Sequence, residues 1–97
     1  MRIVRWAPRA RTSFLRFLTE LTVLSRPAAV RVEAVVERKL DSLALNPGLG
    51  HHSRRWPQYR EWSLTAHHKL LVYDSDNQVL HVVSFYDMRQ DLSRLRP

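Results

Sequence analysis

The chain has 97 residues, of which 16 are Lys or Arg and 9 are Asp or Glu, and its formal net charge is +7 at pH 7. This length allows one domain with a single core, but not an enclosed catalytic cleft together with an accessory domain. We therefore expect the function to lie on a surface. Nearly all the positive charge is arginine, which makes forked contacts with phosphates and carboxylates, so an acidic protein or a nucleic acid is the expected partner. Net charge also serves solubility, which is the simpler interpretation.

The sequence contains no cysteine, which excludes disulfides, thiolate zinc sites and cysteine nucleophiles. A reducing cytoplasm fits this composition. The stretch from Met1 to Trp6 lacks the uninterrupted apolar core of a signal peptide, and no apolar run approaches the ~20 residues of a membrane helix. We therefore expect a cytoplasmic protein that is neither secreted nor inserted in a membrane.

The chain begins with a predicted strand and a predicted helix. Charged and apolar residues alternate from Arg2 to Trp6, a pattern typical of a short strand, which we expect at the edge of a sheet. A helix is predicted to start at Pro8, because proline suits a first helical turn. Its apolar stripe consists of Ala10, Phe14, Phe17, Leu18 and Leu21.

A second helix follows directly. Ser25 or Arg26 can cap it, with Pro27 in its first turn. Its apolar stripe consists of Ala29, Val32, Val36, Leu40 and Leu43. The segment Asn46-Pro47-Gly48-Leu49-Gly50 ends this helix, because the residue before proline avoids helical geometry. Two amphipathic helices joined by a tight turn form a hairpin whose stripes need a sheet to cover them.

A basic and aromatic loop is predicted after Gly50 and continues through Pro57. It carries His51, His52, Arg54, Arg55 and Trp56. Such a cluster can bind phosphates and stack on bases. It can equally be a solvated loop whose tryptophan packs on the core, and both interpretations remain open.

Three antiparallel strands are predicted in the second half of the chain, because runs of β-branched and aromatic residues are separated by polar turns. The strands are Arg60–Leu64, Lys69–Tyr73 and Val79–Tyr86. We expect the turns at Ala66-His67 and at Asp74–Asn77. A tight second turn places Leu71 opposite Leu80 and Lys69 opposite Val82.

Alternation along these strands predicts two different faces. The better core face contains Trp62, Leu64, Leu71, Tyr73, Leu80 and Val82. The other face contains Glu61, Ser63, His68, Leu70, Val72, Val79, His81, Val83 and Phe85. Such a mixed face suits a surface left open for a partner rather than one covered by the chain itself. If the last strand continues, Asp87 and Arg89 fall on the same open side.

We expect no metal site and no cofactor. The pairs His51-His52 and His67-His68 are sequence neighbours, which point to opposite sides of an extended chain and cannot chelate together. The sequence has no phosphate-binding glycine loop and no serine elbow. Acid–base cleavage of RNA would require a histidine or lysine beside an arginine, yet Lys69 falls on the core side of the predicted sheet.

The order of these elements resembles the RelE/ParE superfamily of toxins from bacterial toxin–antitoxin modules. The likeness covers Met1 to Asp91. It rests on the order and spacing of Asn46-Pro47-x-Leu49-Gly50, Arg60-Glu61-Trp62 and the ending Arg89-Gln90-Asp91.

The resemblance implies a fold and a partner. We expect one α+β domain over residues 1–97, with an antiparallel sheet of three to four strands, an N-terminal strand among them, and a helical hairpin packed on one face. A cognate antitoxin would wrap the hairpin and the open sheet face. We assign partner contacts to Arg54, Arg55, Arg60, Leu70, Val83, Phe85, Asp87 and Arg89.

The family divides into ParE-type inhibitors of DNA gyrase and RelE-type ribosome-dependent mRNA endonucleases. Many members carry a basic residue where a gapless match puts Leu70, with Lys69 one place away. Asp87 stands where RelE-type members tend to have a histidine, and a carboxylate there would repel a scissile phosphate. We therefore predict a ParE-like gyrase inhibitor without catalysis. The alternatives are an mRNA endonuclease acting on ribosome-bound transcripts, or an inert member that only binds its antitoxin. The endonuclease would use Arg89, Lys69 and His81.

Overall fold

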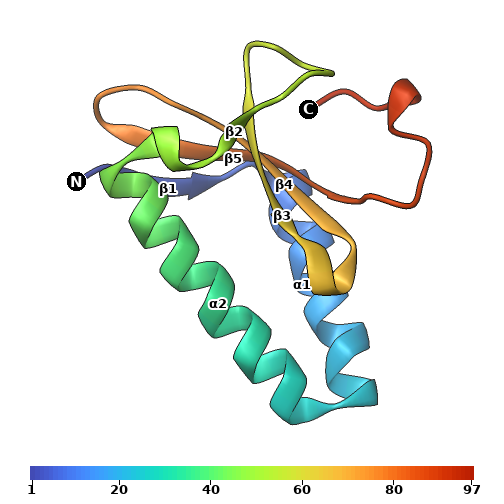
Figure 1. The fold of residues 1–97 in the computed structure, drawn as a ribbon. Coiled ribbons are helices and arrows are strands. Elements are labelled where there is room, and N and C mark those ends of the chain that lie inside the picture. The colour runs from blue at the N-terminus through green and yellow to red at the C-terminus, as the bar shows by residue number, and fades with distance from the viewer.

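A computed structural model describes all residues from 1 to 97 and shows a helical hairpin packed on one face of a five-stranded sheet (Figure 1). The helices are α1 (Pro8–Leu24) and α2 (Arg26–Leu45). The strands are β1 (Ile3–Trp6), β2 (His51–His52), β3 (Arg60–Leu64), β4 (Lys69–Ser75) and β5 (Val79–Asp87). Neither helix is long and apolar enough to cross a membrane.

The hairpin forms as its sequence predicts. Ser25 ends α1 through its backbone N–H, which donates to Leu21 O (2.7 Å), and its side chain caps α2 by accepting from Ala28 N (3.3 Å). One serine therefore serves two helix ends, and the turn between them is as short as possible. Both predicted stripes face the sheet, and every member is buried except the half-buried Leu21.

The sheet is mixed, which corrects the expectation of an antiparallel sheet with three or four strands. The order is β1-β5-β4-β3-β2, and β1 runs parallel to β5, with Val4 opposite Leu80. No tight turn joins these two strands, so nothing local forces them to be antiparallel. The fifth strand, β2, lies in the segment predicted as a loop and pairs His52 with Arg60. A strand of two residues has no sequence pattern of its own.

A bulge changes the predicted register between β4 and β5. Tyr73 lies opposite Val82, but Val72 lies opposite Ser84, so Val83 has no partner of its own. The predicted tight turn is also wrong, because β4 extends to Ser75 and the Asp76 carboxylate accepts from Gln78 N and Val79 N at the start of β5.

The bulge decides which side chains face the helices. Leu71 lies opposite Phe85 instead of Leu80, and Lys69 lies opposite Asp87 instead of Val82. An extra residue reverses the alternation beyond it, since side chains repeat every two residues. Placing Phe85 and Asp87 on the open face was therefore wrong, because both lie on the helix side.

Two apolar clusters lie on opposite faces of the sheet. The main core fills the space between the sheet and the hairpin, where Phe85 packs on Phe14 and Phe17 with ring centroids 5.3 and 5.8 Å apart. On the other face a smaller cluster of four residues is buried. Its members are Leu70, Val72, Val83 and Leu92.

The smaller cluster is covered by the chain itself. Trp56 and Tyr59 pack on it from the loop after β2, and Leu92 and Leu95 pack on it from the C-terminal segment. Covering these strands removes apolar surface from water, which is favourable. The prediction that this sheet face is bare is therefore wrong over β4 and the second half of β5. The half near β1 stays open, where Ile3 is 61% exposed.

Candidate functional site

An open groove lies between the C-terminal half of α1 and the connection from β3 to β4. Its volume is about 320 Å³. The lining residues are Phe17, Glu20, Leu21, Leu24, Ala66, His67, His68, Lys69, Asp87 and Arg89. The groove thus brings together three residues that the sequence marked as candidates, namely Lys69, Asp87 and Arg89.

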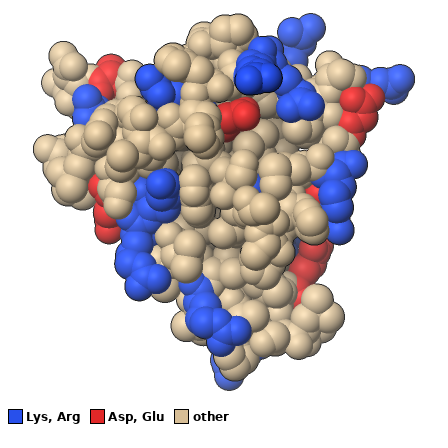
Figure 2. Space-filling model, in the orientation of Figure 1, with Lys and Arg blue, Asp and Glu red and all other residues tan.

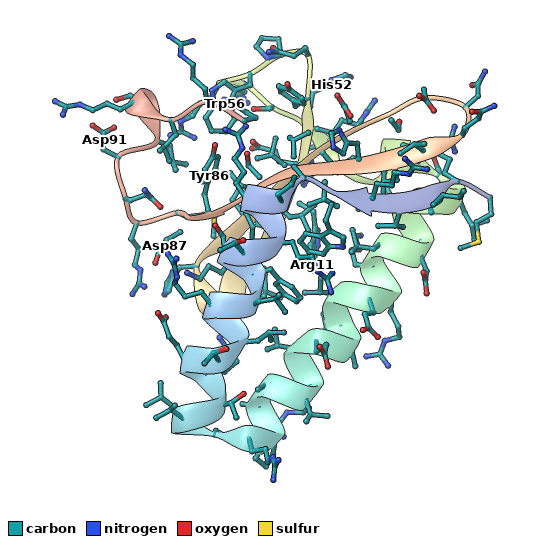
Figure 3. The ribbon with its side chains drawn as sticks, turned by 180° about the vertical axis from the view of Figure 1, so that it is seen from behind. Arg11, His52, Trp56, Tyr86, Asp87 and Asp91 are labelled. Carbon is teal, nitrogen blue, oxygen red and sulfur yellow. The ribbon has the colours of Figure 1, made fainter.

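Asp87 is the centre of a charged cluster in this groove. Its carboxylate accepts hydrogen bonds from Arg89 Nε (3.1 Å), Arg89 Nη2 (2.9 Å) and the Arg89 backbone N–H (2.9 Å). Lys69 Nζ lies 3.5 Å from the same carboxylate and 5.1 Å from the centre of the Phe17 ring. In Figure 3 Asp87 lies beside α1, on the helix side of the sheet.

These contacts fix the charge of the cluster. Hydrogen bonds from Arg89 hold the pKa of Asp87 well below its usual range, and the nearby Lys69 ammonium lowers it further. The Asp87 carboxylate in turn raises the pKa of Arg89. Asp87 and Arg89 are therefore both ionised near neutral pH. A carboxylate that binds both cations is poorly placed to accept a proton, so this cluster suits recognition more than acid–base catalysis.

The rim of the groove was not predicted from the sequence. Leu24 is 82% exposed at the end of α1, and His67 packs edge to face against Phe17 with centroids 5.6 Å apart. His68 adopts a left-handed conformation (φ 56°) that turns the chain into β4. The available signal was the apolar pair Val23-Leu24, which lies outside the α1 stripe and has no partner within the hairpin.

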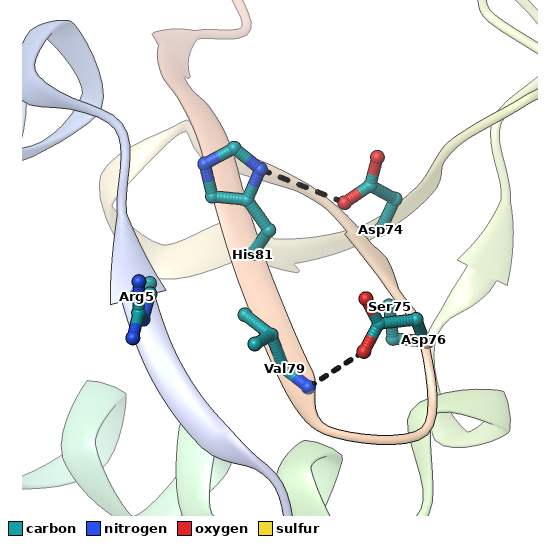
Figure 4. A pocket seen from close by; sticks show the side chains of 6 residues that line it. All are labelled: Arg5, Asp74, Ser75, Asp76, Val79 and His81. Atoms are coloured by element: carbon teal, nitrogen blue, oxygen red, sulfur yellow. Dashed lines mark hydrogen bonds and ion pairs between the residues drawn. The ribbon is translucent and has the colours of Figure 1, made fainter.

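His81 lies apart from the groove. It faces the opposite side of the sheet, where its Nδ1 is 3.7 Å from Asp74 Oδ1 in a hollow of about 450 Å³ (Figure 4). Asp87 lies six positions further along β5, roughly 20 Å away at ~3.3 Å per strand residue. The structure therefore does not bring His81 together with Lys69 and Arg89, the three residues that an RNA-cleaving site would have used.

The three remaining arginines among the candidates lie near β2. Arg60 is half-buried, and its Nη1 donates to Gly50 O (2.9 Å) while Nη2 lies 3.1 Å from His52 Nε2. Arg60 therefore holds the β2 edge in place. Arg54 and Arg55 are exposed on the loop that follows β2.

Three apolar candidates are not available on the surface. Leu70 is 3% exposed, Val83 is 6% exposed and Phe85 is 5% exposed. Leu70 and Val83 lie beneath the loop after β2 and the C-terminal segment, which together we call the covering segments. Phe85 lies in the main core because of the bulge. Their assignment as surface contacts is corrected accordingly. No group of three or more His, Asp or Glu side chains is arranged to hold a metal ion.

Comparison with known proteins agrees with this geometry. Residues 4–92 match the family model described as the ParE toxin of the type II toxin–antitoxin system, parDE. A search of the curated proteins finds no match. A solved structure described as the chromosomal ParDE TA system from P. aeruginosa has a similar fold, with a TM-score of 0.74. It shares 14% identity, and the alignment covers 92% of this chain and 98% of that chain, so the likeness establishes the fold alone.

Fold and groove together define a small cationic α+β protein with a helical hairpin on one face of a five-stranded sheet. The family match covers nearly the whole chain, so the chain belongs to the ParE toxin family of type II toxin–antitoxin systems. The predicted superfamily and its ParE branch are confirmed. Its partner is a cognate antitoxin.

Proposed function

We propose that this toxin inhibits DNA gyrase by direct protein contact and that its antitoxin blocks the contact. Gyrase is the target that the resemblance to ParE-type members implies, and membership of the ParE family supports it. The action would take place in the cytoplasm, where a bacterial gyrase works. The observation that carries the proposal is the groove with Asp87 at its centre.

The groove suits a protein surface better than a phosphate. Asp87 already occupies two donors of Arg89 and pairs with Lys69, which leaves few donors for a phosphate, whereas the apolar lining of the groove suits the apolar side chains of a protein. The Arg89 side chain is 68% exposed and uses only Nε and Nη2 for Asp87, which leaves Nη1 free to donate. Leu21 and Leu24 supply an apolar border next to this guanidinium.

The antitoxin would neutralise the toxin by lying along the hairpin. Val23, Leu24 and Val30 are 84%, 82% and 63% exposed there, a large apolar exposure for a small domain. Leu24 belongs both to this surface and to the groove. An antitoxin segment that packs on the end of α1 would therefore also cover the groove.

Expression of the toxin without its antitoxin tests the target. We expect growth arrest with relaxed or broken DNA and intact transcripts, and we expect the purified chain to inhibit supercoiling by gyrase. Transcripts cleaved in a ribosome-dependent manner, with supercoiling unaffected, would instead support the endonuclease alternative. Normal growth at full expression would leave only an inert antitoxin-binding protein.

A further inference from the structure

A basic surface lies at the β2 edge of the sheet, which we call the basic edge and define as His51, His52, Arg54, Arg55 and Arg60. A hollow of about 510 Å³ opens here, lined by His51, His52, Arg54, Arg55 and Glu61. Figure 2 shows Lys and Arg atoms at the top, where Figure 1 places the loop after β2, and further Lys and Arg atoms in the lower half, where the hairpin extends. Neither the groove nor the hairpin surface includes these residues.

The loop that carries the arginines is anchored. Ser53 N donates to Tyr59 O (3.0 Å), Tyr59 N donates to Trp56 O (2.8 Å), and Trp56 N donates to Ser53 Oγ (3.0 Å). Trp56 packs against Tyr86 with ring centroids 5.6 Å apart, on the sheet face away from the helices (Figure 3). With the backbone held in this way, Arg54 and Arg55 project from a defined loop.

The charge of the basic edge is largely available. Arg54, Arg55 and Arg60 form no salt bridge, whereas Arg89 and Arg94 each pair with an aspartate. Glu61 is the only carboxylate lining the hollow, and its Oε2 is shielded from solvent. Asp91 lies near Arg55, but hydrogen bonds from Ser93 are the main reason that the pKa of Asp91 is lowered.

We infer that the basic edge binds the phosphate backbone of a nucleic-acid duplex without reading its sequence. Guanidinium groups make forked contacts with phosphates, and closely spaced phosphates give such contacts an electrostatic gain through counterion release. A single strand would need exposed aromatic rings on which bases stack, and Trp56 is half-buried in the covering loop. The inference goes beyond gyrase inhibition, because it requires no contact with gyrase.

Fluorescence anisotropy with labelled oligonucleotides tests this inference. The probes are duplex DNA, duplex RNA and single-stranded DNA of one arbitrary sequence, titrated with the full chain at several salt concentrations. Each phosphate contact contributes a slope of about 0.9 in log affinity against log salt. We expect Arg54→Ala/Arg55→Ala to reduce the slope by about 1.8 and to weaken duplex binding between about ten- and sixty-fold at ~0.1 M salt.

The matched control is Arg31→Ala/Arg38→Ala, which removes the same charge from exposed positions on α2. We expect this variant to retain most of the slope. If the double variant at the loop fails to fold by circular dichroism, Arg54→Gln and Arg55→Gln tested singly should each give about half the change in slope. Tighter binding of duplex DNA or of duplex RNA would show which of the two nucleic acids supplies the phosphate backbone that the basic edge binds.

Three results would overturn the inference. The first is an equal loss of affinity in the two double variants, which would mean that net charge alone attracts the probe. The second is tighter binding of the single strand than of either duplex. The third is an absence of duplex binding by the unmodified chain at low salt.

Discussion

Gly50 lies where the chain leaves the second helix and passes the side chain of Tyr73. Tyr73 Oη donates to Pro47 O (2.6 Å), and burial raises the pKa of this phenol. A Cβ on Gly50 would clash with Tyr73 Oη and lie 2.8 and 2.9 Å from two ring carbons. The ring is fully buried, so it has no room to move away. The backbone of Gly50 is ordinary extended chain, so close contact is the reason for glycine here.

We predict that Gly50→Ala lowers the free energy of unfolding by about 1–3 kcal/mol, the usual cost of overpacking a core. Urea denaturation measures the change. Gly48→Ala is the matched control, because the nearest atom to its added Cβ is Asn46 Oδ1 at 3.3 Å. If both variants lose the same stability, the contact with Tyr73 is not the cause.

A second prediction concerns the ionisation of Asp87. Its folded-state pKa lies below the unfolded value, so its ionised form stabilises the fold above the ordinary aspartate range, and this stabilisation is lost as pH falls below about 4. Asp87→Asn removes this loss. We expect its stability to decrease less than that of the unmodified chain between about pH 5 and about pH 2, measured by urea denaturation. Asp41→Asn, whose carboxylate makes no hydrogen bond or ion pair, should keep the steeper decrease.

Arg89 is the residue whose replacement tests the groove as a contact site. We predict that Arg89→Ala inhibits gyrase about tenfold more weakly, the size of one ~1.4 kcal/mol contact, while its circular dichroism spectrum stays unchanged. Supercoiling assays give the comparison. Arg94→Ala serves as control, because Arg94 also pairs with an aspartate but lies on the C-terminal segment. Equal inhibition by Arg89→Ala and the unmodified toxin would remove Arg89 from the contact.

The covering segments, which are the loop after β2 and the C-terminal segment, bury part of the sheet face that points away from the helices. Leu92 is 5% exposed against Leu70, Val72 and Val83, and the Tyr86 hydroxyl donates to Arg96 O (2.8 Å) further along the same segment. The short 3₁₀ turn Leu92–Arg94 begins at Asp91, whose side chain accepts from Ser93 N (3.0 Å). The C-terminal segment is therefore held by one buried side chain and a few hydrogen bonds.

We predict that Leu92→Ala destabilises the chain by about 2 kcal/mol, the lower end for a buried leucine, because a terminal segment can partly collapse into the space. It should also increase binding of an apolar dye to the uncovered strands. Leu45→Ala, at a position 67% exposed, should change stability by less than about 0.5 kcal/mol. An unchanged midpoint for Leu92→Ala in urea would mean that the segment does not cover the sheet in solution.

In the whole molecule, the apolar surface of the hairpin and the basic edge lie at opposite ends. Val23, Leu24 and Val30 are exposed near the turn between α1 and α2, whereas the basic edge lies beyond the sheet (Figure 1). Exposed arginines add charge along α1 of the hairpin, among them Arg9 and Arg16. An antitoxin on the hairpin would thus leave the basic edge accessible.

We predict that antitoxin affinity falls about tenfold between ~0.1 and ~0.5 M salt, because screening weakens attraction to a chain of charge +7. Titration calorimetry at several salt concentrations measures this. Arg9→Gln/Arg16→Gln should flatten the dependence, and Arg54→Gln/Arg55→Gln should change affinity by less than about twofold. Affinity that is insensitive to salt would assign the binding to the apolar side chains alone.

The sequence by itself determined the helical hairpin, the main core and the family. The α1 and α2 stripes repeat every three or four residues, and Ser25 and Pro27 mark the helix boundary, so these features are encoded locally. Leu71, Tyr73, Leu80 and Val82 also pointed to the core without knowledge of the register, because the alternation within β4 is unbroken and the extra residue of β5, Val83, follows Val82.

Only the tertiary structure revealed the register between β4 and β5, the parallel pairing of β1 and the segments that cover Leu70. Each of these features depends on pairing or packing between segments that are distant in the sequence, which no local pattern specifies. This holds for the bulge, for the direction of β1 and for the place where Trp56 and Leu92 pack. For the same reason the sequence named Lys69, Asp87 and Arg89 but did not place them in one groove with Leu24. Their proximity results from the register between β4 and β5, which differs from the predicted one and puts Asp87 opposite Lys69 on the helix side of the sheet.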